Sequence, residues 1–320
     1  MPIEHRAKRK VVIVGAGAVG STFAYALAQD GAATEIALVD ANIDLAKGQA
    51  LDLAHGCPFF PTVQIRSGDK NDYADATVIV LTAGTAQRPG ESRLALLRRN
   101  AGIVEQIVDD IVEQKSQAVL LVVTNPVDVL TYVAYRRSGW PRRRVIGSGT
   151  VLDSARLRYL LSQHFHVDIH NVHAYVLGEH GDSELAAWSM THVGGTPIDE
   201  FCRLYGDHEN WPQERRRLEE AVRNSAYHII DYKGATWFGV GMALVRIVGA
   251  ILRDARSVLT VSAVLEGEFG LQGLSLGVPC IVSSNGVDSI IAASLDADER
   301  AALANSASVI SSALEELAGA

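Results

Sequence analysis

Residues 10–20 read Lys-Val-Val-Ile-Val-Gly-Ala-Gly-Ala-Val-Gly, and this stretch decides the fold of the first half of the chain. The apolar run Lys10–Val14 predicts a buried strand, and the alanine-rich segment after the glycines predicts a helix. Gly15 and Gly17 would let backbone N–H groups approach a pyrophosphate at the positive end of that helix, while Gly20 would let helix and strand pack closely. The stretch therefore predicts a dinucleotide-binding unit.

A carboxylate at the end of the next predicted strand, Glu35–Val39, strengthens this prediction. Asp40 lies 20 residues after Gly20, where it would accept hydrogen bonds from the hydroxyls of an adenosine ribose. Ala41 and Asn42 follow, and neither could pair with a 2′-phosphate, so the expected cofactor is NAD rather than NADP. The structural alternative is a glycine turn followed by a helix-capping aspartate.

The first half continues with alternating strand and helix patterns, which are typical of a doubly wound parallel sheet. After residue 148 the pattern changes to long helices followed by strand-like runs. We therefore expect an α/β fold with a Rossmann-type NAD-binding domain, residues 1–148, and a mixed α+β catalytic domain, residues 149–320. Strands are predicted at Lys10–Val14, Glu35–Val39, Val78–Thr82, Ala118–Thr124, Val145–Gly149, His173–Leu177, Val258–Glu266 and Gly277–Ser283, and helices at Ala18–Gln29, Asp44–His55, Arg93–Gln114, Leu152–Phe165, Gln213–Tyr232, Gly239–Arg253 and Asp298–Leu317.

Composition limits the classes of partner. The chain has 320 residues, of which 48% are hydrophobic and 21% charged, as in ordinary soluble globular proteins. Its net charge of -8 argues against a nucleic-acid partner. The basic segment at residues 5–10 is expected to be a solvated arm. The uncharged run that follows it, residues 11–29, contains glycine, serine and threonine, so neither a signal peptide nor a membrane anchor is expected.

The cysteines provide an expectation about the cell compartment. The three residues Cys57, Cys202 and Cys280 are odd in number, far apart and without metal-binding spacing. This pattern fits a reducing cytoplasm, where we expect them to serve as small buried hydrophobic residues.

A histidine in a glycine-flanked loop, Gly178-Glu179-His180-Gly181-Asp182, is the predicted chemical centre. Asp153 would accept the Nδ1 proton of His180, fixing its tautomer and raising its pKa, unless it only caps the following helix. Arg156 would project on the same side as Asp153 and bind a carboxylate at two points; the alternative is a surface arginine paired with a neighbour. These residues predict a hydride-transfer enzyme acting on a small anionic carbonyl compound.

Two loops after predicted strands would complete the site. Gln87–Arg93 contains a Pro-Gly turn pair and is predicted to be a lid, with Arg93 polarising the substrate carbonyl. Asn125 ends the next strand, where it would donate to the reacting oxygen, while Thr124 would face the nicotinamide. The bond from Asn125 to Pro126 is a candidate for the cis isomer.

The chain resembles the lactate/malate dehydrogenase family of L-2-hydroxy acid dehydrogenases and, within it, the bacterial L-lactate dehydrogenases. The resemblance covers nearly the whole chain and rests on the ordered motifs GAGAVGS, AQRPGESR, TNPVDV, GSGTVLDSARLR, NVHAYVLGEHGDSE and KGATWFGVG. It implies a tetramer in which His180 donates a proton to pyruvate, with Asp153 as its partner and Arg156 as carboxylate clamp. It further implies Arg93, Asn125 and Thr236 as substrate-binding residues, and an NAD site lined by Gly15, Val19, Gly20, Asp40, Gly84 and Thr85.

Gln87 bears on the choice of substrate. In this family, malate dehydrogenases carry arginine at the matching position and lactate dehydrogenases carry glutamine. A second substrate carboxylate without a counter-charge would be costly to desolvate, so pyruvate is expected over oxaloacetate. Arg88, next to it, keeps a malate or other L-2-hydroxy acid dehydrogenase open as an alternative. A non-catalytic NAD-binding sensor is the alternative from another class.

Two further residues match an allosteric site in the family. Allosteric bacterial lactate dehydrogenases resemble this chain in the positions of Arg158 and His173, which implies that fructose 1,6-bisphosphate binds across a subunit interface and activates the enzyme. The nearby histidines His164, His166, His170 and His173 also raise the question of zinc. No cysteine lies near them and Asp168 is the one carboxylate, so no metal is expected there.

Overall fold

A computed structural model describes residues 9–85, 90, 92–206 and 209–319 of the chain. Its centre is a nine-stranded sheet in the order β14-β13-β12-β6-β5-β4-β1-β2-β3. The six strands of the first half are parallel and have the order of a dinucleotide-binding sheet, which confirms the predicted α/β class. They are β1 Lys10–Val14, β2 Glu35–Val39, β3 Gln64–Ser67, β4 Val78–Leu81, β5 Val119–Val122 and β6 Val145–Gly147.

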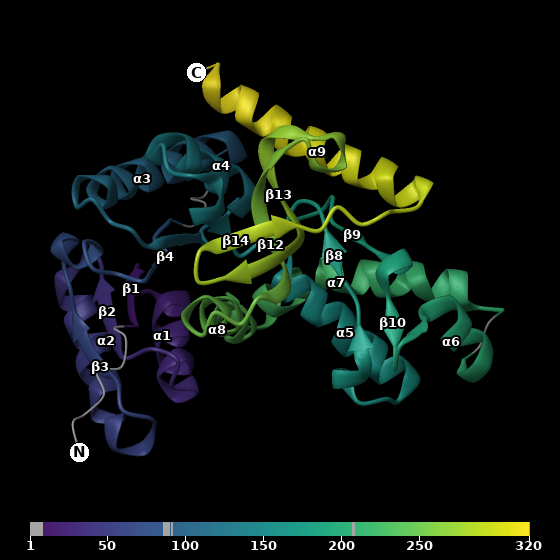
Figure 1. Cartoon of the computed structure of the whole chain (residues 1–320), viewed down its shortest axis with the longest axis horizontal. Coiled ribbons are helices and arrows are strands. Elements are labelled where there is room, and N and C mark those ends of the chain that lie inside the picture. Colours follow the sequence, from purple (N-terminus) through teal and green to yellow (C-terminus); the bar gives the residue numbers. More distant parts are fainter. Residues whose placement is uncertain (1–8, 86–89, 91, 207–208, 320) are drawn as a thin grey trace.

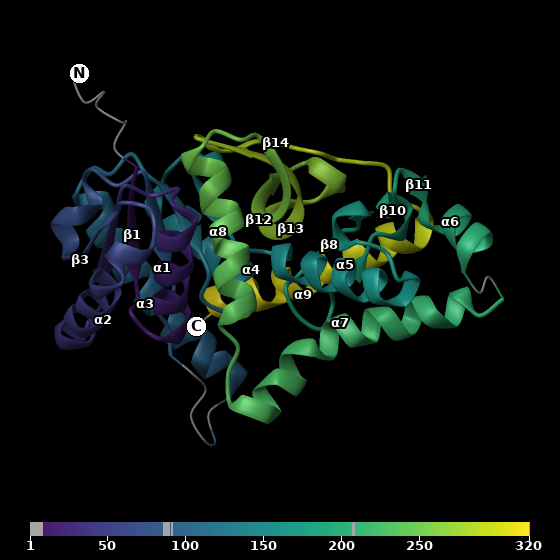
Figure 2. The ribbon, with the colours of Figure 1, turned by 90° about the horizontal axis from the view of Figure 1, so that it is seen from below.

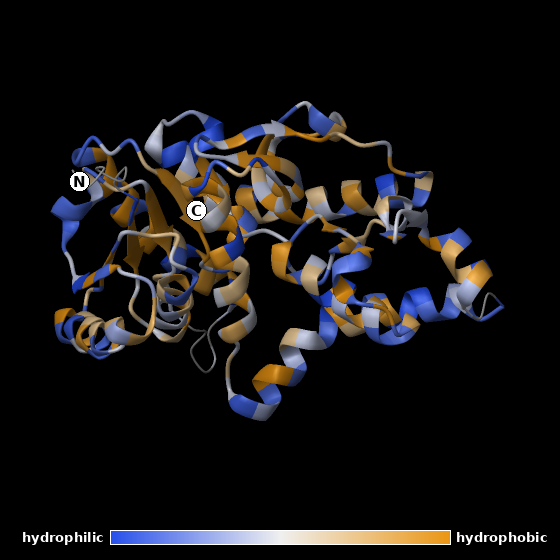
Figure 3. Ribbon diagram, turned by 60° about the horizontal axis from the view of Figure 1, so that its bottom comes forward, coloured by the Kyte–Doolittle hydropathy of each residue, from blue (hydrophilic) through white to orange (hydrophobic). Residues whose placement is uncertain are grey.

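Helices cover both faces of these strands, and this is why the strands are apolar along their length. Figure 1 shows α3 and α4 on one side of the sheet and α1 with α8 on the other. The orange strands in Figure 3 mark the apolar centre of this half. The helices of the first half are α1 Ala18–Asp30, α2 Ile43–His55, α3 Arg93–Glu113 and α4 Val127–Ser138.

The second half extends the sheet of the first. Its strands β12, β13 and β14 form an antiparallel meander, and β12 pairs with β6 through Ser262 and Gly147. The sheet is therefore continuous across the predicted domain boundary at residue 148. The elements are α5 Val151–Phe165, β7 Val172–His173, β8 Val176–Leu177, β9 Leu185–Ala186, β10 His192–Val193, β11 Thr196–Pro197, α6 Ile198–Tyr205, α7 Trp211–Lys233, α8 Phe238–Leu252, β12 Ser257–Glu266, β13 Gln272–Ser283, β14 Gly286–Ile290 and α9 Ala297–Ala318.

Figure 2 shows α7 running beneath α5 and then turning into α8 through residues 234–237. The C-terminal helix α9 runs along the top of the molecule in Figure 1, above β8 and β9. None of the described helices is long and apolar enough to cross a lipid bilayer.

Two expectations about local structure are wrong. The run His173–Leu177 is not one strand: β7 and β8 belong to different sheets. Lys10 is not part of a solvated arm, because β1 pairs on both sides and leaves this residue only 2% exposed. Its ammonium lies 2.7 Å from Asp72 Oδ1 and 2.5 Å from Asp75 Oδ1, and these carboxylates compensate the burial of the charge.

The three cysteines differ in burial. Cys202 and Cys280 are buried, as expected, whereas Cys57 is only partly buried. Its thiol lies 3.7 Å from the carbonyl oxygen of Val63.

Candidate active site

Segments that are distant in sequence meet at the carboxyl edge of the parallel strands. A cavity of about 200 Å³ lies there, between the loops after β5 and β6 and helices α5 and α7. Its lining includes five residues that the sequence predicted for the site, namely Val19, Asn125, Arg156, His180 and Thr236. The proposed proton source, anion clamp and cofactor side therefore share one cavity.

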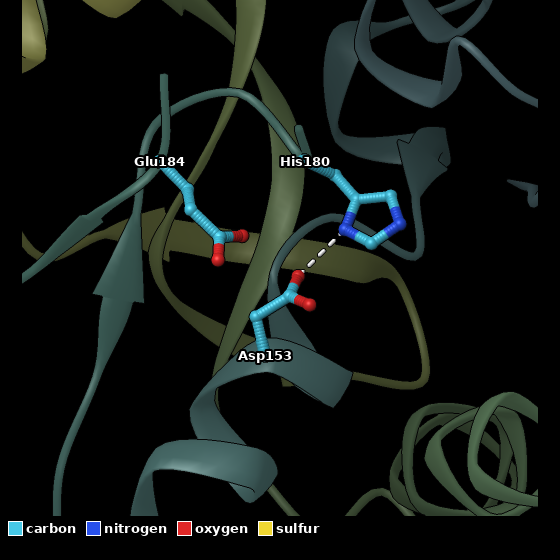
Figure 4. A group of neighbouring side chains, drawn as sticks. All are labelled: Asp153, His180 and Glu184. Atoms are coloured by element: carbon cyan, nitrogen blue, oxygen red, sulfur yellow. Dashed lines mark hydrogen bonds and ion pairs between the residues drawn. The ribbon is translucent and has the colours of Figure 1, made fainter. Parts of the chain in front are cut away.

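His180 and Asp153 form a direct pair. The Nδ1 atom of His180 lies 2.6 Å from Asp153 Oδ2, and the carboxyl side chain is 1% exposed (Figure 4). An ionised carboxylate can only accept, so Nδ1 carries the proton of this bond and Nε2 is left for the cavity. Asp153 does not cap its helix, because α5 begins at Val151 after the N-cap Thr150.

This pairing shifts both ionisation equilibria. Burial disfavours the imidazolium, but the charge of Asp153 and its hydrogen bond outweigh burial and raise the pKa of His180 to about 9. Burial likewise opposes ionisation of Asp153, yet His180 and Arg156 hold the pKa of its carboxyl below the usual range. The ground state at neutral pH is therefore a protonated His180 beside an ionised Asp153.

Arg156 lies beside the same carboxylate. Its Nη1 donates to Asp153 Oδ1 across 2.6 Å, so the two oxygens of Asp153 hold one arginine and one histidine. The alternative of a surface arginine is excluded, since the side chain is 15% exposed and lines the cavity. Its other N–H groups can receive a substrate carboxylate.

Buried groups behind the loop hold His180 in place. The backbone N–H of His180 donates to Asp128 Oδ2 across 2.8 Å, and the hydroxyl of Ser262 donates to Asp128 Oδ1 across 2.6 Å. Burial raises the pKa of Asp128 to about 6, although these two hydrogen bonds oppose the rise. The sequence analysis missed Asp128, and a carboxylate inside the otherwise apolar start of α4 was the signal.

Glu184 is a second functional candidate that the sequence analysis missed. Its carboxyl approaches Asp153 and His180: one possible metal-binding atom from each of the three side chains lies within 4.8 Å of the other two. Figure 4 shows the three side chains converging. Burial, followed by repulsion from Asp153, raises the pKa of Glu184 to about 8. The trio has the donor types of a metal site, but Nδ1 and both oxygens of Asp153 already have partners, so we assign it no metal.

The residues of the predicted nucleotide site fit an extended dinucleotide. Gly15 has φ of 108°, and a Cβ there would lie 2.7 Å from the backbone nitrogen of Ala83. A Cβ on Gly20 would overlap the carbonyl oxygen of Gly15, whereas one on Gly17 would meet open space. The start of α1 has no side-chain cap, so its first N–H groups can bind a pyrophosphate.

Asp40 is held beside this turn. Its carboxylate accepts from the backbone N–H of Ala16 across 2.7 Å and from that of Asn42 across 2.8 Å. Each oxygen keeps a further acceptor position, which suits the two hydroxyls of a ribose.

The loops after β4 and β5 are tied together by Asn100, which the sequence analysis also missed. Its Oδ1 accepts from the backbone N–H of Thr85 across 3.0 Å, and its Nδ2 donates to the carbonyl of Asn125 across 3.2 Å. The bond from Asn125 to Pro126 is cis. Thr124 donates to the carbonyl oxygen of Ala83, and its methyl group occupies the space where a Cβ on Gly84 would be.

The lid region is described in part. Arg93 is the exposed first residue of α3, and the hydroxyl of the N-cap Ser92 accepts from the N–H of Ala95. Arg93 does not line the 200 Å³ cavity. Gln87 and Arg88, which carry the prediction about substrate choice, lie outside the described residues.

The two predicted effector residues share a second cavity. It has a volume of about 530 Å³, and Arg158, His173 and Arg246 line it. Arg158 Nε donates to the carbonyl of Val172 across 2.8 Å, which places the guanidinium at the end of β7. Of the histidines considered for zinc, His170 pairs with Asp168 at the surface and His164 packs edge-on against Phe165.

The fold and the site define a Rossmann-type dinucleotide-binding protein with a histidine suited to acid/base chemistry. Family models match both halves: the lactate/malate dehydrogenase NAD binding domain over residues 9–147 and the lactate/malate dehydrogenase alpha/beta C-terminal domain over residues 150–319. The chain belongs to the lactate/malate dehydrogenase family.

Similar proteins cover almost the whole chain. An L-lactate dehydrogenase of Treponema denticola is 57% identical over 311 residues, which are 97% of this chain and 98% of that one. An L-lactate dehydrogenase of Thermoanaerobacter pseudethanolicus is 49% identical over 311 residues, which are 96% of this chain and 99% of that one. The solved minor L-lactate dehydrogenase of Enterococcus mundtii in its ligands-bound form has a TM-score of 0.94 at 44% identity, covering 97% of this chain and 98% of that one.

Proposed function

We propose that this protein is an NAD-dependent L-lactate dehydrogenase, which interconverts pyruvate and L-lactate. The observation that carries the proposal is the contact of His180 with Asp153, 2.6 Å, in the cavity that also contains Arg156 and Asn125. The similar proteins named L-lactate dehydrogenase support the choice of substrate. Residues 1–148 would hold the dinucleotide and residues 149–320 would supply most of the substrate site.

The chain's own residues divide the work. Arg156 binds the substrate carboxylate and so orients the keto group toward His180. Nε2 of protonated His180 gives its proton to the keto oxygen, while Arg93 and Asn125 stabilise the charge that develops on it. Thr236 lies against the substrate side chain. NADH, when bound along the Gly15 to Gly20 turn beside Asp40, Gly84 and Thr85, supplies the hydride.

The assay is NADH oxidation with a series of 2-keto acids. We expect kcat/KM for pyruvate to exceed the values for oxaloacetate and for 2-ketoisocaproate, because Gln87 offers no charge to a second carboxylate. Replacement Gln87→Arg should move the preference toward oxaloacetate. A higher kcat/KM for oxaloacetate in the unmodified protein would instead identify a malate dehydrogenase, and NADH binding without turnover of any keto acid would identify a sensor.

A variant of the proton donor tests the chemistry separately from binding. Replacement His180→Asn should lower kcat for pyruvate by about 100-fold or more, the usual contribution of a general acid. The Kd for NADH, measured by fluorescence, should stay within a factor of about two, since His180 lies outside the predicted nucleotide residues. Unchanged turnover in this variant would refute the assignment of His180.

We also propose a tetramer that fructose 1,6-bisphosphate activates. The cavity of Arg158, His173 and Arg246 supports an anion site, because it gathers three side chains that are cationic or can become so. Added fructose 1,6-bisphosphate should lower KM for pyruvate, and Arg158→Gln should abolish that effect. Identical kinetics with and without the compound would rule out activation. The mass of the protein in solution, measured by light scattering, tests the tetramer.

A further inference from the structure

Glu184 is a buried acid to which neither the sequence analysis nor the proposed mechanism gives a role. It lies in the loop between His180 and β9 and is 6% exposed. Its carboxyl points toward the pair of Asp153 and His180 (Figure 4). The carboxyl makes no hydrogen bond to another residue in the described part of the chain.

The charges around Glu184 come from three elements. Asp153 and Arg156 face it from α5, His180 belongs to its own loop, and Arg223 reaches it from α7. The guanidinium of Arg223 lies 3.4 Å from the backbone oxygen of Glu184 rather than pairing with the carboxyl. Asp153 is ionised and already shared between His180 and Arg156, so a second negative charge beside it is costly.

We propose that Glu184 is a positioning residue that acts on the pair of Asp153 and His180. Its carboxyl is uncharged around neutral pH, and its ionisation holds the proton more firmly on His180. When His180 is protonated, the uncharged carboxyl fills the pocket beside Asp153 without adding repulsion. When the pH rises, the carboxylate that forms opposes loss of the imidazolium proton, since it adds a negative charge within 4.8 Å. Glu184 therefore extends the range in which His180 can donate.

The raised pKa of Glu184, about 8, agrees with this geometry because it lies close to that of His180, about 9. Two groups that interact so closely titrate together, because the loss of a proton from one group changes the proton affinity of the other. The consequence for catalysis depends on the proposed function, whereas the titration of His180 does not.

The decisive experiment follows His180 directly by NMR with ring-labelled histidine, assigning its signal by the loss of that signal in His180→Asn. Replacement Glu184→Gln keeps the shape of the uncharged acid and removes its ionisation. We expect it to lower the titration midpoint of His180 by on the order of one pH unit. Glu184→Asp, which retains a carboxyl, should restore most of the difference. An unchanged midpoint in Glu184→Gln would overturn the proposal.

Infrared difference spectra provide a readout that needs no turnover. The wild-type protein at pH 7 should show the carbonyl stretch of a protonated carboxyl, and Glu184→Gln should lack it; absence of the band from the wild type would overturn the proposal. The matched control is Glu220→Gln, an exposed glutamate on α7, which should change neither the band nor the midpoint. If pyruvate is reduced, the alkaline limb of kcat/KM should move with the NMR midpoint. Lack of turnover would contradict the proposed function and leave the titration as the test of Glu184.

Discussion

At the scale of the residue, the charge of Asp153 sets the pH at which His180 can act. The pKa of His180 is raised from 6.5 to about 9, so the ring stays protonated through neutral pH and loses its proton as the pH rises through about 9. In the proposed mechanism pyruvate reduction needs the protonated ring and should fall in that range, whereas lactate oxidation needs the neutral ring and should rise. Stopped-flow measurement of both directions between pH 6 and about 10 checks this sign.

Removal of the charge on Asp153 should reverse that shift. We expect Asp153→Asn to move the alkaline limb of pyruvate reduction to lower pH and to reduce kcat/KM by about 100-fold or more. The chain offers a matched control in Asp168, which pairs with His170 Nδ1 at 2.7 Å but on an exposed surface. Asp168→Asn should leave the pH profile unchanged. Equal limbs for wild type and Asp153→Asn would show that the pair does not set the pKa.

The sequence predicted the residues whose chemistry stands out in a motif and missed those whose role comes from burial. His180 lies in a glycine-flanked loop and Arg156 lies on a helix, so the sequence implies where their side chains project. The structure places both side chains in one cavity. Glu184 and Asp128 also lie in the quoted motifs, but the sequence alone cannot separate these carboxylates from surface acids. Only the fold shows that one faces Asp153 and that the other receives the N–H of His180.

Helix boundaries were predicted well where a local residue marks the start or the end of the helix. Gly31 ends α1 in the left-handed conformation, and Ser92 caps α3 with its side chain. Helix α4 was not predicted because its valine and threonine content resembles a strand, and β3 was not predicted because it is only four residues long at the edge of the sheet. Local pattern decides little in such segments, because their packing partners determine the structure.

Helix α9 supports the catalytic loop from outside the cavity. Glu299 and Ser306 are seven residues apart on one face of the helix and are both buried. Glu299 accepts from the N–H and the hydroxyl of Ser189, and Ser306 accepts from the N–H of Glu179 across 2.6 Å. The helix therefore holds the segment from Glu179 to Ser189 at both ends.

Loss of the Ser306 hydroxyl should loosen that segment. We expect Ser306→Ala to lower the free energy of unfolding by about 1–3 kcal/mol, since it leaves a buried N–H without its partner, and to lower kcat more than the affinity for NADH. Chemical denaturation, steady-state kinetics and NADH titration measure the three quantities. The control Ser308→Ala, on the exposed side of α9, should match the wild type. A stable Ser306→Ala variant with full kcat would argue against this support.

At the scale of the whole molecule, the two halves share one sheet, which the sequence patterns did not predict because pairing of β6 with β12 is non-local. Gly149 lies at this junction with φ of 52°, and a Cβ there would lie 2.6 Å from the carbonyl oxygen of Thr260. Gly139 has a similar φ of 63° but open space around it. A comparison of the two glycines therefore separates the cost of backbone strain, which both positions share, from the cost of a steric clash, which only Gly149 has.

Alanine at these two positions should therefore have different effects. Gly139→Ala should cost about 1–2 kcal/mol of unfolding free energy, the strain of a left-handed alanine, whereas Gly149→Ala should cost more because β6 and β12 must also separate. Since the sheet is continuous, both halves should unfold in one transition in the wild type and in Gly139→Ala. Hydrogen exchange measured across the unfolding transition should give the same midpoint of unfolding for β1 and for β13. Separate midpoints of unfolding in the wild type would show that the halves are energetically independent. Equal losses of unfolding free energy in the two variants would show that the junction tolerates a side chain.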